Sequence, residues 1–260
     1  MAEASVRRSL FVVAVLLPAA LGVNAQANAP LSQIDATVEV AVVKPHPAAV
    51  MHNNFSFQNN RFELEDQPLL KLIAFAYSLN SRQIVGAPGW VEEKHWDMSG
   101  TTNLTANATL PQEQQLVRQL LKERFGLQFH REKREMPAYA LQVVNGQPRL
   151  TAAADPNLQP LEWTQGNGSQ RTENYRASTM TDFVLIKQLF MDRPLVDQTG
   201  LTGRYDFKLT YTRGDAPDAD ADTPPPQFTA IKEQLGLKFE PVKASVDAFV
   251  IDHVEQPTAN

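Results

Sequence analysis

A 24-residue segment occurs twice in this chain and constrains the fold more than any other feature of the sequence. Residues 121–144 read LKERFGLQFHREKREMPAYALQVV and residues 231–254 read IKEQLGLKFEPVKASVDAFVIDHV, so they align without a gap at an offset of 110. Eight of the 24 aligned positions are identical, whereas ordinary composition would give roughly one or two by chance. Most of the other pairs keep their apolar or polar character. We therefore predict that the chain contains two copies of one folding unit.

The apolar periodicity predicts helices and strands in a repeated order. Residues 116–125 place apolar side chains on one face of a helix, which should end at Gly126 because glycine readily adopts the left-handed conformation of a C-terminal cap. Residues 127–129 and 138–144 are expected to form two separate strands after this helix. Residues 204–212 alternate between apolar and polar, as a half-buried strand does. Each copy is predicted to run helix, strand, strand, helix, strand, strand.

The correspondence extends beyond the aligned segment. Trp96 and Asp97 lie in a predicted strand that matches the strand of Tyr205 and Asp206. Helices packed on one face of a mainly antiparallel sheet would bury the apolar surfaces of both. The predicted fold class is therefore α+β, with two tandem copies of the unit.

This pattern predicts four parts along the chain. They are a signal peptide at residues 1–25, a first α+β unit at 26–144, a polar connection at 145–178 and a second α+β unit at 179–260. The connection is assigned from its proline, glycine and asparagine residues and from its lack of periodicity.

The N-terminus has the pattern of a secretory signal. Arg7 and Arg8 precede an apolar run at residues 10–20, and small residues before and at Ala25 are typical of a cleavage site. The alternative is an uncleaved membrane anchor, but the run is shorter than the ~20 apolar residues that span a bilayer. We expect an exported protein, periplasmic or extracellular, that does not span the membrane after cleavage.

Composition excludes several classes of function. The chain contains no cysteine, which excludes disulfides, thiolate metal sites and a cysteine nucleophile. Its formal net charge is −5, and the leader carries two arginines and one glutamate, so the mature chain is more negative still. A mildly acidic chain is a poor candidate for nonspecific nucleic-acid binding.

The sequence carries no recognisable catalytic or metal-binding motif. No two of its histidines form a His-x-x-x-His pair, and no Gly-x-Ser-x-Gly elbow is present. The acidic run 215–222 lacks the glycine and the final acidic residue of a calcium loop. The turn at residues 86–89 lacks the lysine of a phosphate-binding loop. We predict no catalytic residue, no metal and no cofactor, and a protein that is more plausibly a binding module than an enzyme. The histidines are His46, His52, His95, His130 and His253.

One charge cluster and one aromatic residue are candidates for a binding surface. The cluster is residues 130–135, in which we single out His130, Arg131, Arg134 and Glu135. The alternative is a solvated strand edge whose charges prevent self-pairing. Trp90, beside a glycine-proline turn, is a candidate binding aromatic, and core packing is the alternative.

Several motifs together resemble a known family. The first unit contributes residues 39–41 and 43–45 with much of 83–90 and 120–141, and the second contributes 233–237 with much of 197–207 and 250–257. Val42 departs from the pattern, which has a small polar residue there. Across nearly the whole mature chain these pieces resemble a Soliusitatus-type domain of unknown function, found in secreted proteins and expanded in Acidobacteria. The resemblance implies an exported protein of unknown activity. Related domains are also fused behind membrane-bound metallopeptidase sensors, which implies that any sensor role here would act through a partner.

Two hypotheses for function follow. The first is a noncatalytic extracytoplasmic binding or interaction module, which would bind an envelope protein through the edges of its sheets. The second is a secreted hydrolase that acts on polysaccharide or peptide, with an active site assembled from carboxylates and a histidine. The second requires titratable groups that converge in space.

Overall fold

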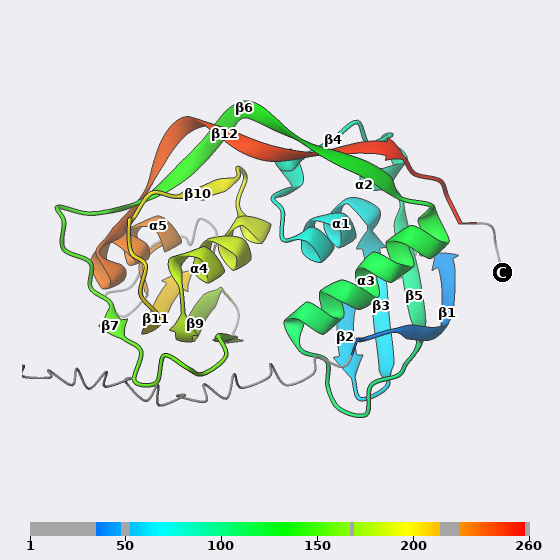
Figure 1. Ribbon diagram of the computed structural model, residues 1–260, viewed down its shortest axis with the longest axis horizontal. Coiled ribbons are helices and arrows are strands. Elements are labelled where there is room, and N and C mark those ends of the chain that lie inside the picture. The colour runs from blue at the N-terminus through cyan, green and yellow to red at the C-terminus, as the bar shows by residue number, and fades with distance from the viewer. Residues whose placement is uncertain (1–34, 48–52, 167–168, 214–223, 258–260) are drawn as a thin grey trace, which may run out of the picture. The chain divides into compact units, whose positions relative to one another are not determined.

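The computed structural model describes residues 35–47, 53–166, 169–213 and 224–257. They form five α-helices and twelve β-strands, arranged in three mostly antiparallel sheets (Figure 1). The predicted leader at residues 1–25, His52 and the acidic run 215–222 lie outside the described residues. In the part of the chain that the structure describes, no helix combines the length and apolar character that crossing a membrane requires.

The first sheet and its helices come from the first half of the chain. Its strands lie in the order β1 (Val38–Pro45), β5 (His95–Thr102), β3 (Arg61–Pro68) and β2 (Asn54–Gln58), all antiparallel. The helices α1 (Leu69–Tyr77), α2 (Trp90–Glu93) and α3 (Leu110–Phe125) accompany it, with the short turn η1 (Ser81–Gln83). Side chains such as Leu64, Met98 and Leu116 are fully buried where strands and helices meet. These residues form a first hydrophobic core.

Helix α3 confirms the clearest prediction from the sequence. Its apolar face is buried through Leu116, Leu120 and Leu121. The Gln112 side-chain oxygen accepts a hydrogen bond from the backbone N–H of Thr109 and so completes a capping box. The helix ends at Gly126, whose φ of 58° lies in the left-handed region.

A third sheet comes from the second half and corrects one prediction. Its strands lie in the order β7 (Thr151–Ala152), β11 (Tyr205–Thr212), β9 (Gln170–Ser178) and β8 (Leu161–Gln165). Helices α4 (Met180–Lys187) and α5 (Gln227–Ala230) accompany it, with η2 (Gln188–Phe190) and η3 (Ile231–Leu235). The segment 145–178, which the sequence predicts to be a polar connection with little periodicity, supplies three of these strands. The sequence of β9 does not show the alternation of apolar and polar residues that is typical of a strand, for two reasons. One of its buried positions is the charged Glu173, and the left-handed residue Ala177 interrupts the two-residue period.

The second sheet is built on one long antiparallel ribbon. It pairs β6 (Gln128–Val143) with β12 (Leu237–His253), and the short strands β10 (Leu195–Asp197) and β4 (Ile84–Val85) add to it in parallel. The two strands predicted at 127–129 and 138–144 are therefore one strand. The charged stretch between them continues the ladder because its side chains stay exposed while its backbone pairs with β12.

The ribbon contributes residues to both cores. Figure 1 shows strands β6 and β12 passing over both groups of helices. Phe249 and Ile251 of β12 belong to the first core, and Leu237 and Phe239 of the same strand belong to the second. Each hydrophobic core is therefore assembled from residues of both halves of the chain.

The pairing of the ribbon is reciprocal. Strand β4 of the first half pairs with β12 at Phe249, and β10 of the second half pairs with β6 at Tyr139, which is the counterpart of Phe249 at an offset of 110. At the middle of the ribbon, Glu135 lies opposite Ser245, its own counterpart at the same offset. Each half of the chain therefore adds one short parallel strand to the long strand of the other half.

Candidate functional site

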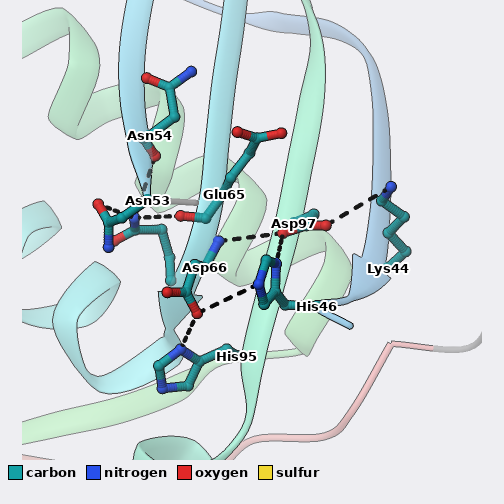
Figure 2. A network of polar contacts seen from close by, with 9 residues as sticks. Lys44, His46, Asn53, Asn54, Glu65, Asp66, His95 and Asp97 are labelled. Atoms are coloured by element: carbon teal, nitrogen blue, oxygen red, sulfur yellow. Dashed lines mark hydrogen bonds and ion pairs between the residues drawn. The ribbon is translucent and has the colours of Figure 1, made fainter. Parts of the chain in front are cut away.

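Two histidines and two aspartates from three strands meet in the first sheet (Figure 2). His46 directly follows β1, Asp66 lies near the end of β3, and His95 and Asp97 begin β5. The Nδ1 atom of His46 lies 2.6 Å from Oδ1 of Asp97 and the Nδ1 atom of His95 lies 2.5 Å from Oδ1 of Asp66. The Nε2 atom of His46 lies 3.8 Å from the same oxygen of Asp66. We call these four residues the His–Asp cluster.

The cluster runs from the interior to the surface. The side chain of His46 is 6% exposed, whereas that of His95 is 40% exposed. Lys44 approaches the buried end, with its Nζ atom 3.7 Å from Oδ2 of Asp97. A solvent-accessible imidazole is therefore linked through a carboxylate to a buried one.

A backbone irregularity places Asp66 in the cluster. The register of β3 and β5 shifts between Leu64 and Gln67, and Asp66 in this bulge has a φ of 57°, which is unusual for a residue other than glycine. The backbone N–H of Asp66 donates to Oδ1 of Asp97 across 3.2 Å. The side-chain amide of Gln67 donates to the backbone oxygen of Glu65 across 2.6 Å and holds the bulge from the other side.

The third sheet contains the same bulge without the cluster. There the left-handed residue is Ala177, whose backbone N–H donates to Oδ1 of Asp206 across 2.7 Å. Asp206 therefore takes the same place beside this bulge that Asp97 takes beside the bulge of β3. In the third sheet the Arg204 side chain also holds the bulge, because its guanidinium donates to the backbone oxygen of Ala177 across 2.7 Å.

The other three positions differ between the sheets. The backbone N–H of His46 bonds the oxygen of His95, and the N–H of Ala153 bonds the oxygen of Arg204 in the same way. Alanine, alanine and arginine therefore stand in the third sheet where the first has His46, Asp66 and His95. The third sheet therefore builds a similar bulge with a different set of side chains, and the His–Asp cluster is found in the first sheet.

The cluster also has a distinct electrostatic character. The hydrogen bond with His95 is the main cause that lowers the pKa of the Asp66 carboxyl. Desolvation raises this pKa, and the charges of His95 and His46 lower it further. An imidazole that is oriented by an ionised carboxylate is suited to accept a proton from water or a substrate. In the described residues, no group of three or more histidine, aspartate or glutamate side chains is arranged to hold a metal ion.

We expect the replacement of His95 by glutamine to raise the pKa of Asp66 toward its ordinary value of 3.8. In the folded wild type, the lowered pKa means that ionised Asp66 stabilises the protein above pH 3.8, and this contribution is lost as the pH falls through the lowered pKa. A carboxyl-carbon NMR titration of Asp66 measures the change. Replacement of His130 by glutamine is the matched control, because His130 pairs with Asp252 instead. An unchanged Asp66 titration in the His95 variant would contradict this account.

The charge cluster predicted at residues 130–135 divides between two faces of β6. On one face, the Nδ1 atom of His130 lies 2.8 Å from Oδ1 of Asp252, and Nε of Arg134 donates to the carboxylate of Glu132. Lys133, on the opposite face, pairs with Asp247 across 2.8 Å. No hydrogen bond or ion pair of Arg131 or Glu135 is found among the described residues.

Trp90 is half-buried and packs against the first core. Its ring meets the ring of Trp96 edge-on, with centroids 6.5 Å apart. No hydrogen bond, ion pair or ring contact joins Trp90 to residues 130–135 in the described part of the chain.

Strand β6 has a long free edge. Strand β10 pairs only with Tyr139, Ala140 and Leu141, so among the described residues 128–138 pair with β12 alone. The backbone N–H of Tyr139 donates to Pro194, and the backbone oxygen of Leu141 accepts from Gln198, so these odd-numbered residues direct their backbone groups away from β12.

The alternation of a strand extends this pattern along the free edge. The backbone groups of Arg131, Lys133 and Glu135 point away from β12 as well. Pro137 occupies another outward position, where its missing N–H removes no bond of the ladder. We call the outward backbone groups of residues 131–135 the β6 edge.

The sequence held a signal for only part of this arrangement. The match of Asp97 to Asp206 pointed to a shared aspartate, but His46 and His95 lie on different strands and could not be paired without the register of β1 and β5. The β6 edge is free because β10 pairs with residues 139–141 of β6, and the sequence alone does not show where this pairing ends.

Comparison with known proteins identifies a family. The family described as "Protein of unknown function (DUF3738)" matches residues 70–254, which is most of the chain. No curated protein and no solved structure matches.

Proposed function

Because this chain belongs to the DUF3738 family of proteins of unknown function, we propose its role from its own residues: an exported, noncatalytic module that binds an extended segment of an envelope protein. The β6 edge carries this proposal. Its outward N–H and C=O groups offer the hydrogen bonds that an added strand requires. The binding surface would be centred on Arg131 and Glu135, whose side chains are exposed beside this edge.

The charges along the edge are compatible with a selective partner. Exposed charges and proline prevent a free edge from pairing with copies of itself. Here the side chains of Lys133 and Asp247 pair with each other across the ribbon, while the outward backbone groups of Lys133 stay available. The alternative, an edge protected by charges without any partner, predicts no capture at this strand.

We expect replacement of Lys133 by proline to abolish partner capture and to leave the fold intact. Proline removes the outward N–H of residue 133 and blocks the approach of a strand, whereas the ladder to β12 uses the neighbouring residues. The mature protein, from Gln26 onward, would be crosslinked in its native envelope fraction, purified and identified with its partners by mass spectrometry.

Replacement of Lys133 by threonine is the matched control for this experiment. It also removes the ion pair with Asp247 but keeps the backbone N–H. Capture that survives in the threonine variant and is lost in the proline variant supports strand addition. Equal capture by both variants, or none by the wild type, would rule out the β6 edge as the binding surface.

We also propose that the protein descends from a duplication and is of the Soliusitatus type, from an acidobacterium. The duplication is supported by the reciprocal pairing of β4 and β10 and by the position of Glu135 opposite Ser245. Export to the periplasm or beyond is supported by the signal-like residues before Ala25.

A secreted hydrolase of polysaccharide or peptide is the second candidate, and the His–Asp cluster favours it. His95 is exposed, its Nδ1 is held by Asp66, and its Nε2 has no partner among the described residues. It would act as general base on a water molecule. A glycan and peptide turnover screen tests this role, and activity that persists in the His95-to-glutamine variant would exclude His95 as the base.

A further inference from the structure

An open groove of about 400 Å³ lies beside helix α3, away from the His–Asp cluster. Tyr77 and Phe129 line it with aromatic surface, and their ring centroids are 4.9 Å apart in an edge-to-face arrangement. Phe129 in turn stacks on Phe249 with centroids 3.9 Å apart, so this wall is rigidly supported. A groove of this size accommodates a small molecule.

Two positively charged side chains also line this groove. Arg118 and Lys122 lie one turn apart on α3 and both line it. The Arg118 guanidinium carbon lies 5.9 Å from the centre of the Tyr77 ring, and one of its nitrogens donates to the backbone oxygen of Ala76. Burial raises the pKa of Tyr77, while the positive charges of Arg118 and Arg131 oppose this rise, so a second guanidinium also acts on the ring.

The charges of these two cations exceed the charge of the Glu123 carboxylate in the same lining. Within the described residues, neither Arg118 nor Lys122 forms an ion pair. Glu123 also lines the groove, and its carboxylate accepts a hydrogen bond from the side-chain amide of Gln119 across 3.0 Å, so the lining carries two positive charges and one negative charge. The lining beside the aromatic wall therefore keeps a net positive charge, in a chain whose formal net charge is −5.

The second half of the chain carries aromatic side chains at the matching positions. At an offset of 110, Phe228 stands at the position that matches Arg118, and Phe239 stands at the position that matches Phe129. Phe228 packs edge-on against Phe239 and against Tyr139, with centroids 5.3 Å and 5.5 Å apart. The second half of the chain therefore places an aromatic side chain where the first half keeps a cation beside an open groove.

We infer that this groove binds an organic anion with a flat apolar body, of the aromatic carboxylate class. The ring of the ligand lies against Tyr77 and Phe129, and its carboxylate accepts hydrogen bonds from Arg118 and Lys122. The inference is independent of strand addition at β6.

Calorimetric titration of the full-length protein with 2-naphthoate tests it. We expect saturable binding with one site in the wild type, and binding that is about tenfold or more weaker for Arg118→Met and for Lys122→Met, because each loses a charged hydrogen bond. The neutral analogue 2-naphthylmethanol should also bind at least about tenfold more weakly. Lys208→Met is the matched control, since Lys208 is exposed on β11, and it should bind 2-naphthoate as the wild type does.

Lys122→Met keeps the test decisive if Arg118→Met fails to fold, because the Lys122 side chain is exposed and makes no ion pair in the described structure. The absence of saturable binding to the wild type would overturn the inference. So would wild-type affinity in the folded Lys122→Met variant, or equal binding of the neutral analogue.

Discussion

Replacing Lys187 with methionine is expected to destabilise the protein by about 3–5 kcal/mol, because it leaves a buried carboxylate without its counter-charge. The Lys187 side chain is 1% exposed, and its Nζ atom lies 2.6 Å from both carboxylate oxygens of Glu173. The hydroxyls of Tyr211 and Tyr175 donate to the same carboxylate across 2.6 Å and 3.0 Å. Burial lowers the pKa of Lys187, and the charge of Glu173 opposes this shift. Urea unfolding, monitored by circular dichroism, measures the loss.

Two further variants separate this effect from the loss of a lysine in general. Lys133→Met breaks the exposed pair with Asp247 and should cost less than about 1 kcal/mol. Adding Glu173→Gln to Lys187→Met removes the uncompensated charge but keeps an acceptor for the tyrosines, and we expect it to recover much of the stability. A loss below about 1 kcal/mol for Lys187→Met alone would contradict the description of this network.

Phe249→Ala should cost about 3–5 kcal/mol as a large-to-small change in a packed core. The side chain is 1% exposed and packs against the rings of Phe129 and Tyr77, with centroids 3.9 Å and 4.8 Å away. Although residue 249 belongs to the second half of the chain, it packs in the first core. Local opening should therefore increase in α1 and α3, as residue-resolved hydrogen exchange would report.

Phe239→Ala is the matched variant on the same strand. Phe239 packs in the second core, so its truncation should increase exchange in α4 and β9 instead. If Phe249→Ala increased hydrogen exchange in α4 and β9 more than in α1 and α3, the assignment of β12 to both cores would be wrong.

The sequence predicted the parts of the fold that depend on local periodicity. Helix α3 was found from its apolar face and Gly126, and β11 from its alternation, because each buries one face against a single core. The α+β class followed from these elements.

The strands that were missed depend on partners distant in the sequence. Strand β6 passes through a charged stretch that only its pairing with β12 makes extended, and β9 buries Glu173 because Lys187 lies opposite it. For the same reason the His–Asp cluster could not be predicted: the distance between His46 and Asp66 is set by a bulge in β3.

Hydrogen exchange along β6, resolved by NMR, tests the central claim most directly. In the isolated protein, the amides of Arg131, Lys133 and Glu135 should exchange rapidly, while those of Glu132 and Arg134 should be protected by β12. In the protein purified with its crosslinked envelope partner, the three outward amides should also become protected. Outward amides that are already protected in the isolated protein, or that stay unprotected in the complex, would contradict strand addition at the β6 edge.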